Sequence, residues 1–302
     1  MRLLSILNEP WLIVPEKLRV IQDIYLTHLH GPKLPHDQIE AIIAKTGGND
    51  NALTTYEVRD GVAIIPIQGV ISKKMNLFTD ISGGVSTEKI GSMVMEAMDD
   101  PGVKAVLLYV DSPGGTVDGT QELANVIANA RDKKCIVAFT DGMMASAAYW
   151  LGAAAERIYI NGDTTNVGSI GVVTEHMDVS KWEEQKGYKT TEITAGRYKR
   201  ITSEYSPLTE EGKTYLQERV DAIYELFTRE VASFRGMDQK KVKNTEARLY
   251  LGKDAIKAGI ADGVSSMGRL LGLMSKDPQN FVRRARAEAS IDEKRRALAC
   301  QN

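Results

Sequence analysis

The amino-acid sequence predicts an α/β fold of stacked βαβ units, with a helical arm at the N-terminus and a charged helical tail at the C-terminus. The first observation is a set of short, continuous apolar runs, such as 103–110 and 135–139. Such runs are typical of strands that are buried on both faces of a parallel sheet. The second is that segments with helical spacing follow them, at 116–131 and 145–156. Strands that alternate with helices favour parallel βαβ units.

The arm has an apolar helical pattern at 18–25 and 37–44, and the glycine- and asparagine-containing stretch 46–51 predicts a linker after it. We therefore expect an arm at 1–54, a main domain at 55–265 and a charged tail at 266–302. In the main domain the expected elements are strand 61–71, a helix capped by Ser86, strand 103–110, helix 116–131, strand 135–139, helix 145–156, strands 157–160 and 170–174, helix 178–186, strand 190–194, a long helix at 209–234, a helical turn at 252–259 and a last small strand. The last 20 residues are expected to form a solvated helix.

The composition excludes several classes of protein. Among 302 residues, 43% are hydrophobic and 26% are charged, and the net charge is −2, which gives no electrostatic reason to expect nucleic acid as a partner. The two cysteines, Cys135 and Cys300, form no disulfide framework and no metal-binding cluster. No phosphate-binding or dinucleotide-binding motif is present, so no cofactor is expected. The apolar run at the N-terminus stops at Asn8, so we expect no membrane anchor and a cytoplasmic protein.

Two strand-to-helix turns carry the chemistry. The first, 111–115, reads Asp-Ser-Pro-Gly-Gly, and the second, 142–149, places Ser146 among alanines at the start of a helix. A serine nucleophile needs a base and donors for the oxyanion it creates. The N–H groups of Ala147 and of Gly114 or Gly115 are the natural donors. Alternatively, the serine is an ordinary N-cap and the glycines form a tight turn.

The residues alone leave two candidates for the general base. His176 follows the expected strand 170–174, whereas the three other histidines lie in the arm. Lys199 lies in the basic stretch 197–200, where a lysine is normally a surface charge. A lysine acts as a base only when burial in an apolar site lowers its pKa. Spacing alone does not select between the two.

The chain resembles the signal peptide peptidase A family of serine peptidases between residues 61 and 264. The matching segments, in order, are 84–87, 103–115, 144–149, 167–172, 196–199 and 251–262. The resemblance implies a ClpP/crotonase-like fold and a Ser-Lys dyad, with Ser146 as nucleophile and Lys199 as general base. It also implies that Ser169 orients the lysine and that Gly114 and Ala147 supply the oxyanion donors. A lysine base works in its neutral form, so activity is expected to rise toward alkaline pH.

The arm, with Leu-Asn-Glu-Pro-Trp-Leu-Ile-Val-Pro at 7–15, resembles the phage capsid-assembly protease branch of the family (the head protein C type). This implies a polypeptide substrate such as a capsid scaffold or portal protein. It also implies that the protease acts in the host cytoplasm or the prohead. It also implies a homo-oligomeric ring, because in this family neighbouring subunits can contribute the serine and the lysine of one site. The alternatives are a soluble cellular homologue, an acyl-CoA-processing enzyme of the crotonase fold, and a non-catalytic assembly scaffold.

Overall fold

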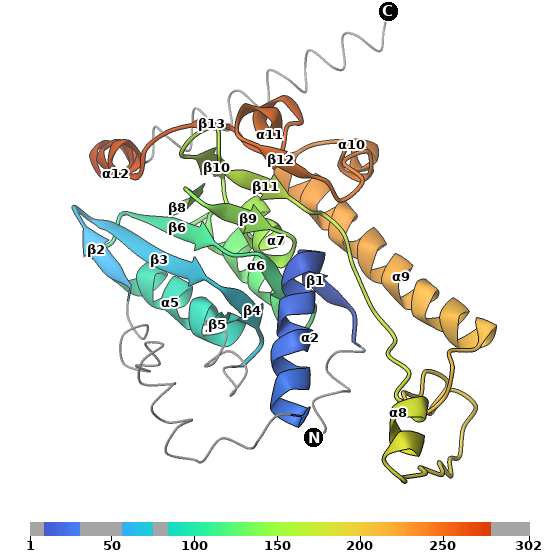
Figure 1. The fold of residues 1–302 in the computed structure, drawn as a ribbon. Coiled ribbons are helices and arrows are strands. Elements are labelled where there is room, and N and C mark those ends of the chain that lie inside the picture. The colour runs from blue at the N-terminus through green and yellow to red at the C-terminus, as the bar shows by residue number, and fades with distance from the viewer. Residues whose placement is uncertain (1–8, 31–55, 75–83, 279–302) are drawn as a thin grey trace, which may run out of the picture. The chain divides into compact units, whose positions relative to one another are not determined.

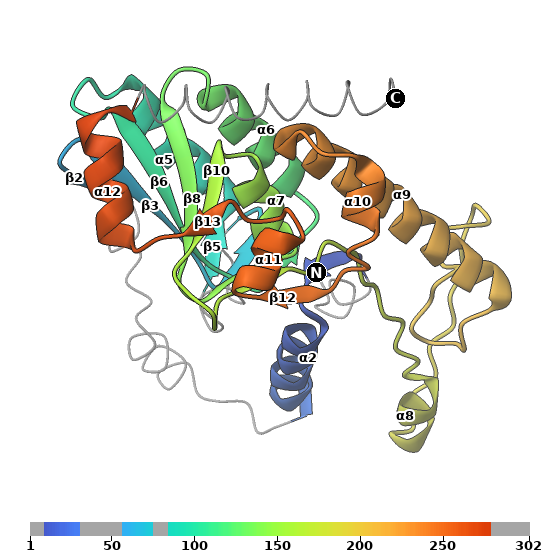
Figure 2. The ribbon, with the colours of Figure 1, turned by 90° about the horizontal axis from the view of Figure 1, so that it is seen from above.

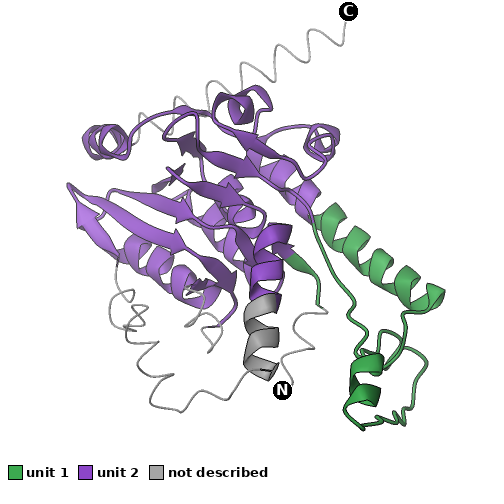
Figure 3. Ribbon diagram, viewed as in Figure 1, with its two compact units in different colours: residues 1–11, 172–226 green, residues 12–171, 227–302 purple. Residues whose placement is uncertain are grey.

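The computed structural model describes residues 9–30, 56–74 and 84–278. Two compact units make up the chain, one of residues 1–11 and 172–226 (unit 1) and one of residues 12–171 and 227–302 (unit 2), coloured separately in Figure 3. The expected helical segment at 37–44, the expected linker at 46–51 and the terminal helix of the tail lie outside the described residues.

Unit 2 is built on a six-stranded sheet with the order β13-β10-β8-β6-β3-β2. The four inner strands, which run parallel, are β3 (Val62–Gln68), β6 (Ala105–Asp111), β8 (Cys135–Thr140) and β10 (Arg157–Ile160). One edge strand, β2 (Glu57–Arg59), is antiparallel to β3, and the other, β13 (Gly263–Val264), is parallel to β10. The predicted parallel α/β fold is therefore confirmed (Figure 1).

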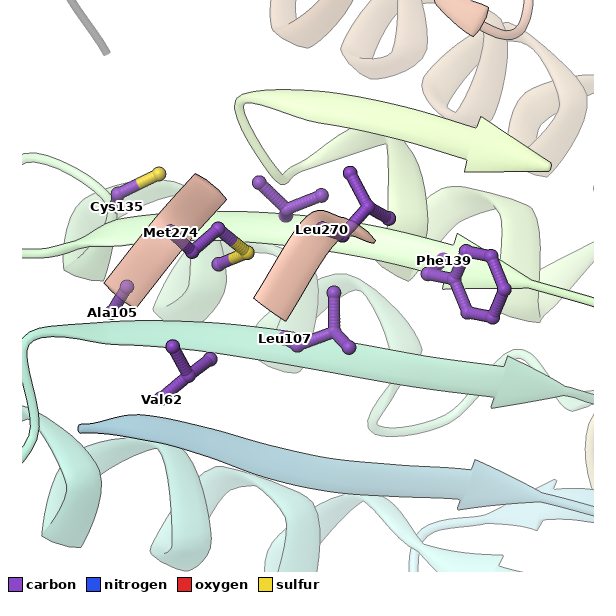
Figure 4. Close-up of a cluster of buried hydrophobic side chains, with 8 residues drawn as sticks. Val62, Ala105, Leu107, Cys135, Phe139, Leu270 and Met274 are labelled. Atoms are coloured by element: carbon purple, nitrogen blue, oxygen red, sulfur yellow. The ribbon is translucent and has the colours of Figure 1, made fainter. Parts of the chain in front are cut away.

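Helices cover both faces of this sheet. The helices between the strands are α5 (Thr87–Asp99), α6 (Thr120–Ala130) and α7 (Ala147–Ala153). Val62 of β3 and alternate residues of β6 and β8 form a separate apolar cluster with Leu270 and Met274 of α12 (Met267–Lys276), as Figure 4 shows. Successive side chains of a strand point to opposite faces, so this cluster lies on one face only. The helix α12 falls within the segment expected to be a charged tail.

A second layer of short strands continues beyond the central sheet. One sheet has the order β1-β7-β4-β5, from β1 (Trp11–Ile13), β7 (Gly114–Thr116), β4 (Val70–Ser72) and β5 (Gly84–Ser86). The other has the order β12-β11-β9, from β12 (Leu249–Leu251), β11 (Asn166–Gly168) and β9 (Met143–Ala145). Strands β4, β7, β9 and β11 follow β3, β6, β8 and β10 in sequence, so this layer lies at the carboxyl ends of the parallel strands.

The remaining helices come from the arm, from unit 1 and from the C-terminal part of unit 2. The arm supplies α2 (Pro15–His30), which directly follows β1, and Leu12 and Leu18 of this segment are fully buried. Unit 1 contains α8 (Ser180–Gln185) and the first part of α9 (Glu210–Arg235), which continues into unit 2 (Figure 3). Two short helices of unit 2, α10 (Gln239–Lys243) and α11 (Lys253–Lys257), lie on either side of β12 in sequence, and Figure 2 shows them from above. No described helix has the length and apolar character needed to cross a membrane.

Three predicted strands need correction. The run 61–71 is divided between β3 and β4, because Gly69 has a positive φ of 74° and takes the chain from one sheet to the other. No strand forms at 170–174, where Val173 makes only an isolated bridge with Trp11. No strand forms at 190–194 either, since its residues are exposed and have no partner strand in unit 1. Strand propensity alone does not form a strand without packing.

Candidate active site

Ser146 lies in a sharp turn between strand β9 and helix α7, with φ 55° and ψ −118°. A non-glycine residue with positive φ is strained and persists only where its surroundings hold it. Here the Ser146 N–H donates to the carbonyl oxygen of Gly168 at 2.9 Å, and its own carbonyl oxygen accepts the N–H of Trp150 at 3.0 Å. A strained strand-to-helix turn of this kind is also the setting of the nucleophile in α/β-hydrolases.

The side chain of Ser146 is fully buried, and its hydroxyl has a long contact of 3.5 Å to the carbonyl oxygen of Gly171. Helix α7 begins at Ala147, whose N–H belongs to the first helical turn and has no acceptor within the helix. The serine therefore lies directly before a donor of the kind an oxyanion requires.

Gly114 opens β7 and borders Ser146. Its φ is 104°, and a Cβ atom at this position would lie 2.1 Å from the Leu12 carbonyl oxygen and 2.9 Å from the Ser146 Cβ. At Gly115 a Cβ would lie 1.8 Å from the carbonyl oxygen of Ile71. Both glycines are required because another backbone or the serine itself comes within contact distance. The predicted glycine turn and serine turn are thus adjacent in unit 2.

Ser112 connects these two turns and was not singled out from the sequence. Its hydroxyl accepts the N–H of Gly114 at 3.1 Å, and its side chain is fully buried. Its backbone N–H donates to the Met143 carbonyl oxygen at 2.8 Å, and its carbonyl oxygen accepts the Ala145 N–H at 3.1 Å. Its place in the Asp-Ser-Pro-Gly-Gly stretch was the available signal. The Gly114 N–H is therefore bonded to a side chain in this structure.

Ser169 and Ser146 lie at equivalent positions, at the ends of two paired strands. Strands β9 and β11 are parallel with Ala145 opposite Gly168, so each serine directly follows a paired residue. Ser169 also has a positive φ of 53°, and its N–H donates to the Arg248 carbonyl oxygen at 3.0 Å. Its side chain is almost fully buried. The structure therefore brings both predicted serines to the same end of the second layer.

Lys199 belongs to unit 1, in a turn whose other members have partners. Arg197 forms an ion pair with Glu211, and the Tyr198 ring stacks on Tyr215 with centroids 5.5 Å apart. Lys199 itself is exposed, so the apolar burial expected of a lysine base is not found around it in unit 1. The ion pairs described in this turn belong to its neighbours Arg197 and Arg200.

Arg200 anchors the same turn. Its guanidinium pairs with Glu192 and with Glu204, the latter at 2.9 Å. The hydrogen bond with Glu192 and the charges of both carboxylates outweigh burial and raise the pKa of Arg200. The other candidate base, His176, also lies in unit 1, where its Nε2 is 2.9 Å from the Ser203 carbonyl oxygen.

A buried polar network lies beside the first turn of α7, which contains Tyr149. The Tyr149 hydroxyl donates to the Ile260 carbonyl oxygen at 3.1 Å. Near it, Asp262 accepts hydrogen bonds from Arg235 at 2.7 Å and from Arg157 at 3.1 Å. Burial alone would raise the pKa of Asp262, but the charge of Arg235 and these hydrogen bonds outweigh it and lower that pKa. Burial also raises the pKa of Tyr149. This network fixes the helix that carries Ser146 at its start.

The described residues contain no group of three or more His, Cys, Asp or Glu side chains arranged to hold a metal ion. The chemistry available in unit 2 is that of a buried serine beside backbone donors. The described groups are therefore suited to nucleophilic acyl transfer, provided that a base reaches the serine.

Comparison with known proteins places the chain among peptidases. Residues 128–279 match peptidase family S49, and residues 67–161 match the Clp protease family, in agreement with the predicted ClpP-like fold. Capsid assembly protease C of Escherichia phage lambda is 32% identical over 84% of this chain and 60% of its own length. Head-tail preconnector protein GP5 of Enterobacteria phage P21 is 28% identical over 97% of this chain and 62% of its own. The chloroplastic serine protease SPPA of Arabidopsis thaliana is 27% identical over 71% of this chain and 32% of its own. The chain thus spans about three-fifths of the length of both phage relatives.

Proposed function

Because the chain belongs to peptidase family S49, we propose that it is a serine endopeptidase with Ser146 as nucleophile and Lys199 as general base. The observation that carries the proposal is the strained turn of Ser146, with Gly114 against its Cβ and the start of α7 directly after it. An N-cap serine needs no positive φ and no glycine pressed against it, so the alternative of a merely structural serine explains less.

The reaction follows from the groups at the turn. The Ser146 oxygen attacks the carbonyl carbon of a peptide bond while the Lys199 amine takes the hydroxyl proton. The N–H groups of Ala147 and Gly114 donate to the oxyanion, for which the Gly114 N–H must leave the Ser112 hydroxyl or be shared with it. The proton then passes to the leaving amine, and water hydrolyses the acyl-enzyme. Ser169 orients the lysine in this scheme.

The role of Lys199 as the base rests on the family resemblance, because its side chain is exposed in unit 1 and not buried. A carboxylate partner would stabilise the charged form of a lysine. The carboxylates of Glu192, Glu204 and Glu211 pair instead with the arginines on either side of Lys199. The lysine is thus held in a fixed turn without a recorded ion pair among the described residues of unit 1. Because a lysine base works only in its neutral form, activity should rise toward alkaline pH, whereas a rise centred near pH ~6.5 would indicate a histidine such as His176.

We further propose a role in phage capsid assembly. One relative is named as a capsid assembly protease and another as a head-tail preconnector protein, and the second is similar over 97% of this chain, including the arm. The substrate would be a capsid scaffold or portal polypeptide, and the place of action the host cytoplasm or the prohead. The working form would be a homo-oligomer in which neighbouring subunits share sites. A soluble cellular protease is the second candidate, supported by the cellular relative in Arabidopsis thaliana.

Cleavage of a scaffold-derived polypeptide by Ser146→Ala, Lys199→Ala and an equimolar mixture of both tests the proposal. Lys186→Ala, at another exposed lysine of unit 1, is the matched control and should cleave like the wild type. Both active-site variants should be inactive, and activity regained on mixing would support sites shared between subunits. Normal cleavage by either variant would refute the dyad, whereas absence of cleavage by the wild type would favour a non-catalytic scaffold. Addition of an acyl-CoA should leave the melting temperature unchanged, because a shift would favour the crotonase-type alternative.

A further inference from the structure

Strand β1 comes from the N-terminal arm and forms the end of its sheet, against the strand that begins with Gly114. The Val14 N–H donates to the Pro113 carbonyl oxygen at 3.0 Å. The point where a Cβ of residue 114 would lie is 2.1 Å from the Leu12 carbonyl oxygen and 2.9 Å from the Ser146 Cβ. The backbone of residues 12–14 therefore runs along the turn that borders the proposed nucleophile.

This edge is suited to hold a polypeptide. Enzymes and binding domains commonly take up an extended peptide as an added strand, through main-chain hydrogen bonds. One side of β7 is already paired with β4, through Gly115 and Ile71. The other side of β7 is the one that β1 covers, and Ser146 beside it is fully buried. In this arrangement a second chain can neither pair with β7 nor bring a peptide bond to Ser146.

We propose that β1 occupies the strand edge of β7 with which a substrate polypeptide would pair. The chain would then be in a latent form, in which its own arm blocks the substrate site. This inference rests on the proposed peptidase function. The ligand class of the edge is an extended polypeptide, and residues 12–14 of the same chain occupy it first. Leu12, Ile13 and Val14 are all buried, at 0%, 3% and 5% exposure. An incoming peptide would have to expose these side chains to replace β1, so activation requires that the arm be displaced or cut.

The test uses Val14→Pro, which removes the N–H that bonds to Pro113 and leaves the carbonyl oxygen that accepts from Lys17 and Leu18 at the start of α2. The readout is the rate at which a small fluorophosphonate labels Ser146, followed by intact mass. We expect labelling about tenfold faster than in the wild type, the effect of one lost backbone hydrogen bond. A synthetic peptide of residues 9–17 should slow labelling of the variant.

Two controls separate the outcomes. Ile136→Ala truncates a fully buried side chain of β8, away from β1, and should be labelled at the wild-type rate. Val14→Pro combined with Ser146→Ala should not be labelled at all. Equal labelling of Val14→Pro and wild type, with the serine-free variant blank, would overturn the inference while the peptidase function stands. If neither the wild type nor Val14→Pro is labelled, both the proposed function and this inference are refuted.

Hydrogen exchange provides a second readout if Val14→Pro does not fold. The amide of Val14 in the wild type should be protected before labelling and should exchange faster once Ser146 has been labelled to completion. Unchanged protection at Val14 after complete labelling would show that β1 is a permanent structural strand, and would overturn the inference.

Discussion

Gly114 and Ser146 lie in contact, so that a Cβ atom at position 114 would be 2.9 Å from the Cβ of the serine. The glycine turn and the serine turn are separated in the sequence by the whole of α6 and β8. Their contact in unit 2 brings the proposed nucleophile next to its candidate oxyanion donors, and it makes position 114 a sensitive test of that assignment.

Gly114→Ala should reduce kcat/KM by at least about 100-fold, because the added methyl displaces the backbone N–H of residue 114 and a misplaced oxyanion donor is lost to the reaction. The added methyl would meet the Leu12 carbonyl oxygen and Ser146, and the φ of 104° is unfavourable for alanine. Peptide cleavage and thermal unfolding would be measured together. Gly162→Ala is the matched control, because nothing lies within 4 Å of a Cβ there. Activity at the wild-type level in Gly114→Ala would exclude a close approach of residue 114 to the reacting serine.

Ser169→Ala should lower kcat about 100-fold, the lower end of what general base catalysis contributes, without a change in the melting temperature. Alanine tolerates the φ of 53° as poorly as serine does, so the change removes only the hydroxyl. Ser265→Ala, at a similarly buried serine remote from Ser146 in sequence, should keep full activity. A pH–rate profile would accompany the assay. An unchanged kcat and profile would mean that Ser169 does not act on the base.

Asp262→Asn should destabilise unit 2 by about 3–5 kcal/mol at neutral pH, because Arg235 and Arg157 lose their buried carboxylate. The pKa of Asp262 is lowered in the folded state, so this contribution is present above the unfolded value near pH ~4 and is lost as pH falls through the folded pKa. Urea unfolding at pH 7 and pH 3 should therefore show a smaller difference between variant and wild type in acid. Asp163→Asn, at an exposed carboxylate 3.8 Å from Lys253, should change stability little at either pH.

The Cys135 thiol should not react with Ellman's reagent in the folded protein. The residue is 1% exposed, and burial, assisted by the charge of Glu156, raises its pKa to about 12. The thiolate needed for reaction is therefore absent near pH 8. A Cys300→Ser background leaves one thiol to follow, and it should react on unfolding in urea. Rapid reaction without urea would mean that β8 opens readily.

The central sheet was predictable because its strands are buried on both faces. Every residue of β8 is buried, and most of β3 and β6 are, so each strand appears in the sequence as a continuous apolar run. The long helix was predictable for a similar reason: the structure places α9 at Glu210–Arg235, against an expectation of 209–234. In both cases the local pattern and the tertiary environment agree.

The second layer was not predictable from local pattern. Strands β5, β7, β9, β11 and β12 have three residues each, too few for a periodicity, and β7 reads Gly-Gly-Thr. They form because distant segments pair with them, as β12 does with β11. The reverse error occurred at 190–194, where Thr-Thr-Glu-Ile-Thr has strand propensity but Ile193 is 95% exposed.

The candidate site was predictable only in part for the same reason. Small residues around Ser146 and the paired glycines indicate a close approach of backbones, and both turns follow clear strands. The bond between Ser112 and Gly114, and the pairing of β1 with β7, depend on contacts that no local signal encodes. The roles of Ser146, Lys199, Ser169, Gly114 and Ala147 stay predictions until the variants are assayed.

The packing of α12 limits how far the C-terminus can be shortened. Leu270 and Met274, at 1% and 0% exposure, shield the apolar residues Val62 and Leu107 of the sheet. A chain that ends before residue 267 would leave that face in water, at about 1.5–3 kcal/mol for each side chain that loses its full burial, whereas a chain that ends at 278 would keep it covered. The shortest stable form of this protein therefore extends past all its candidate catalytic residues, into a segment whose charge makes it look dispensable.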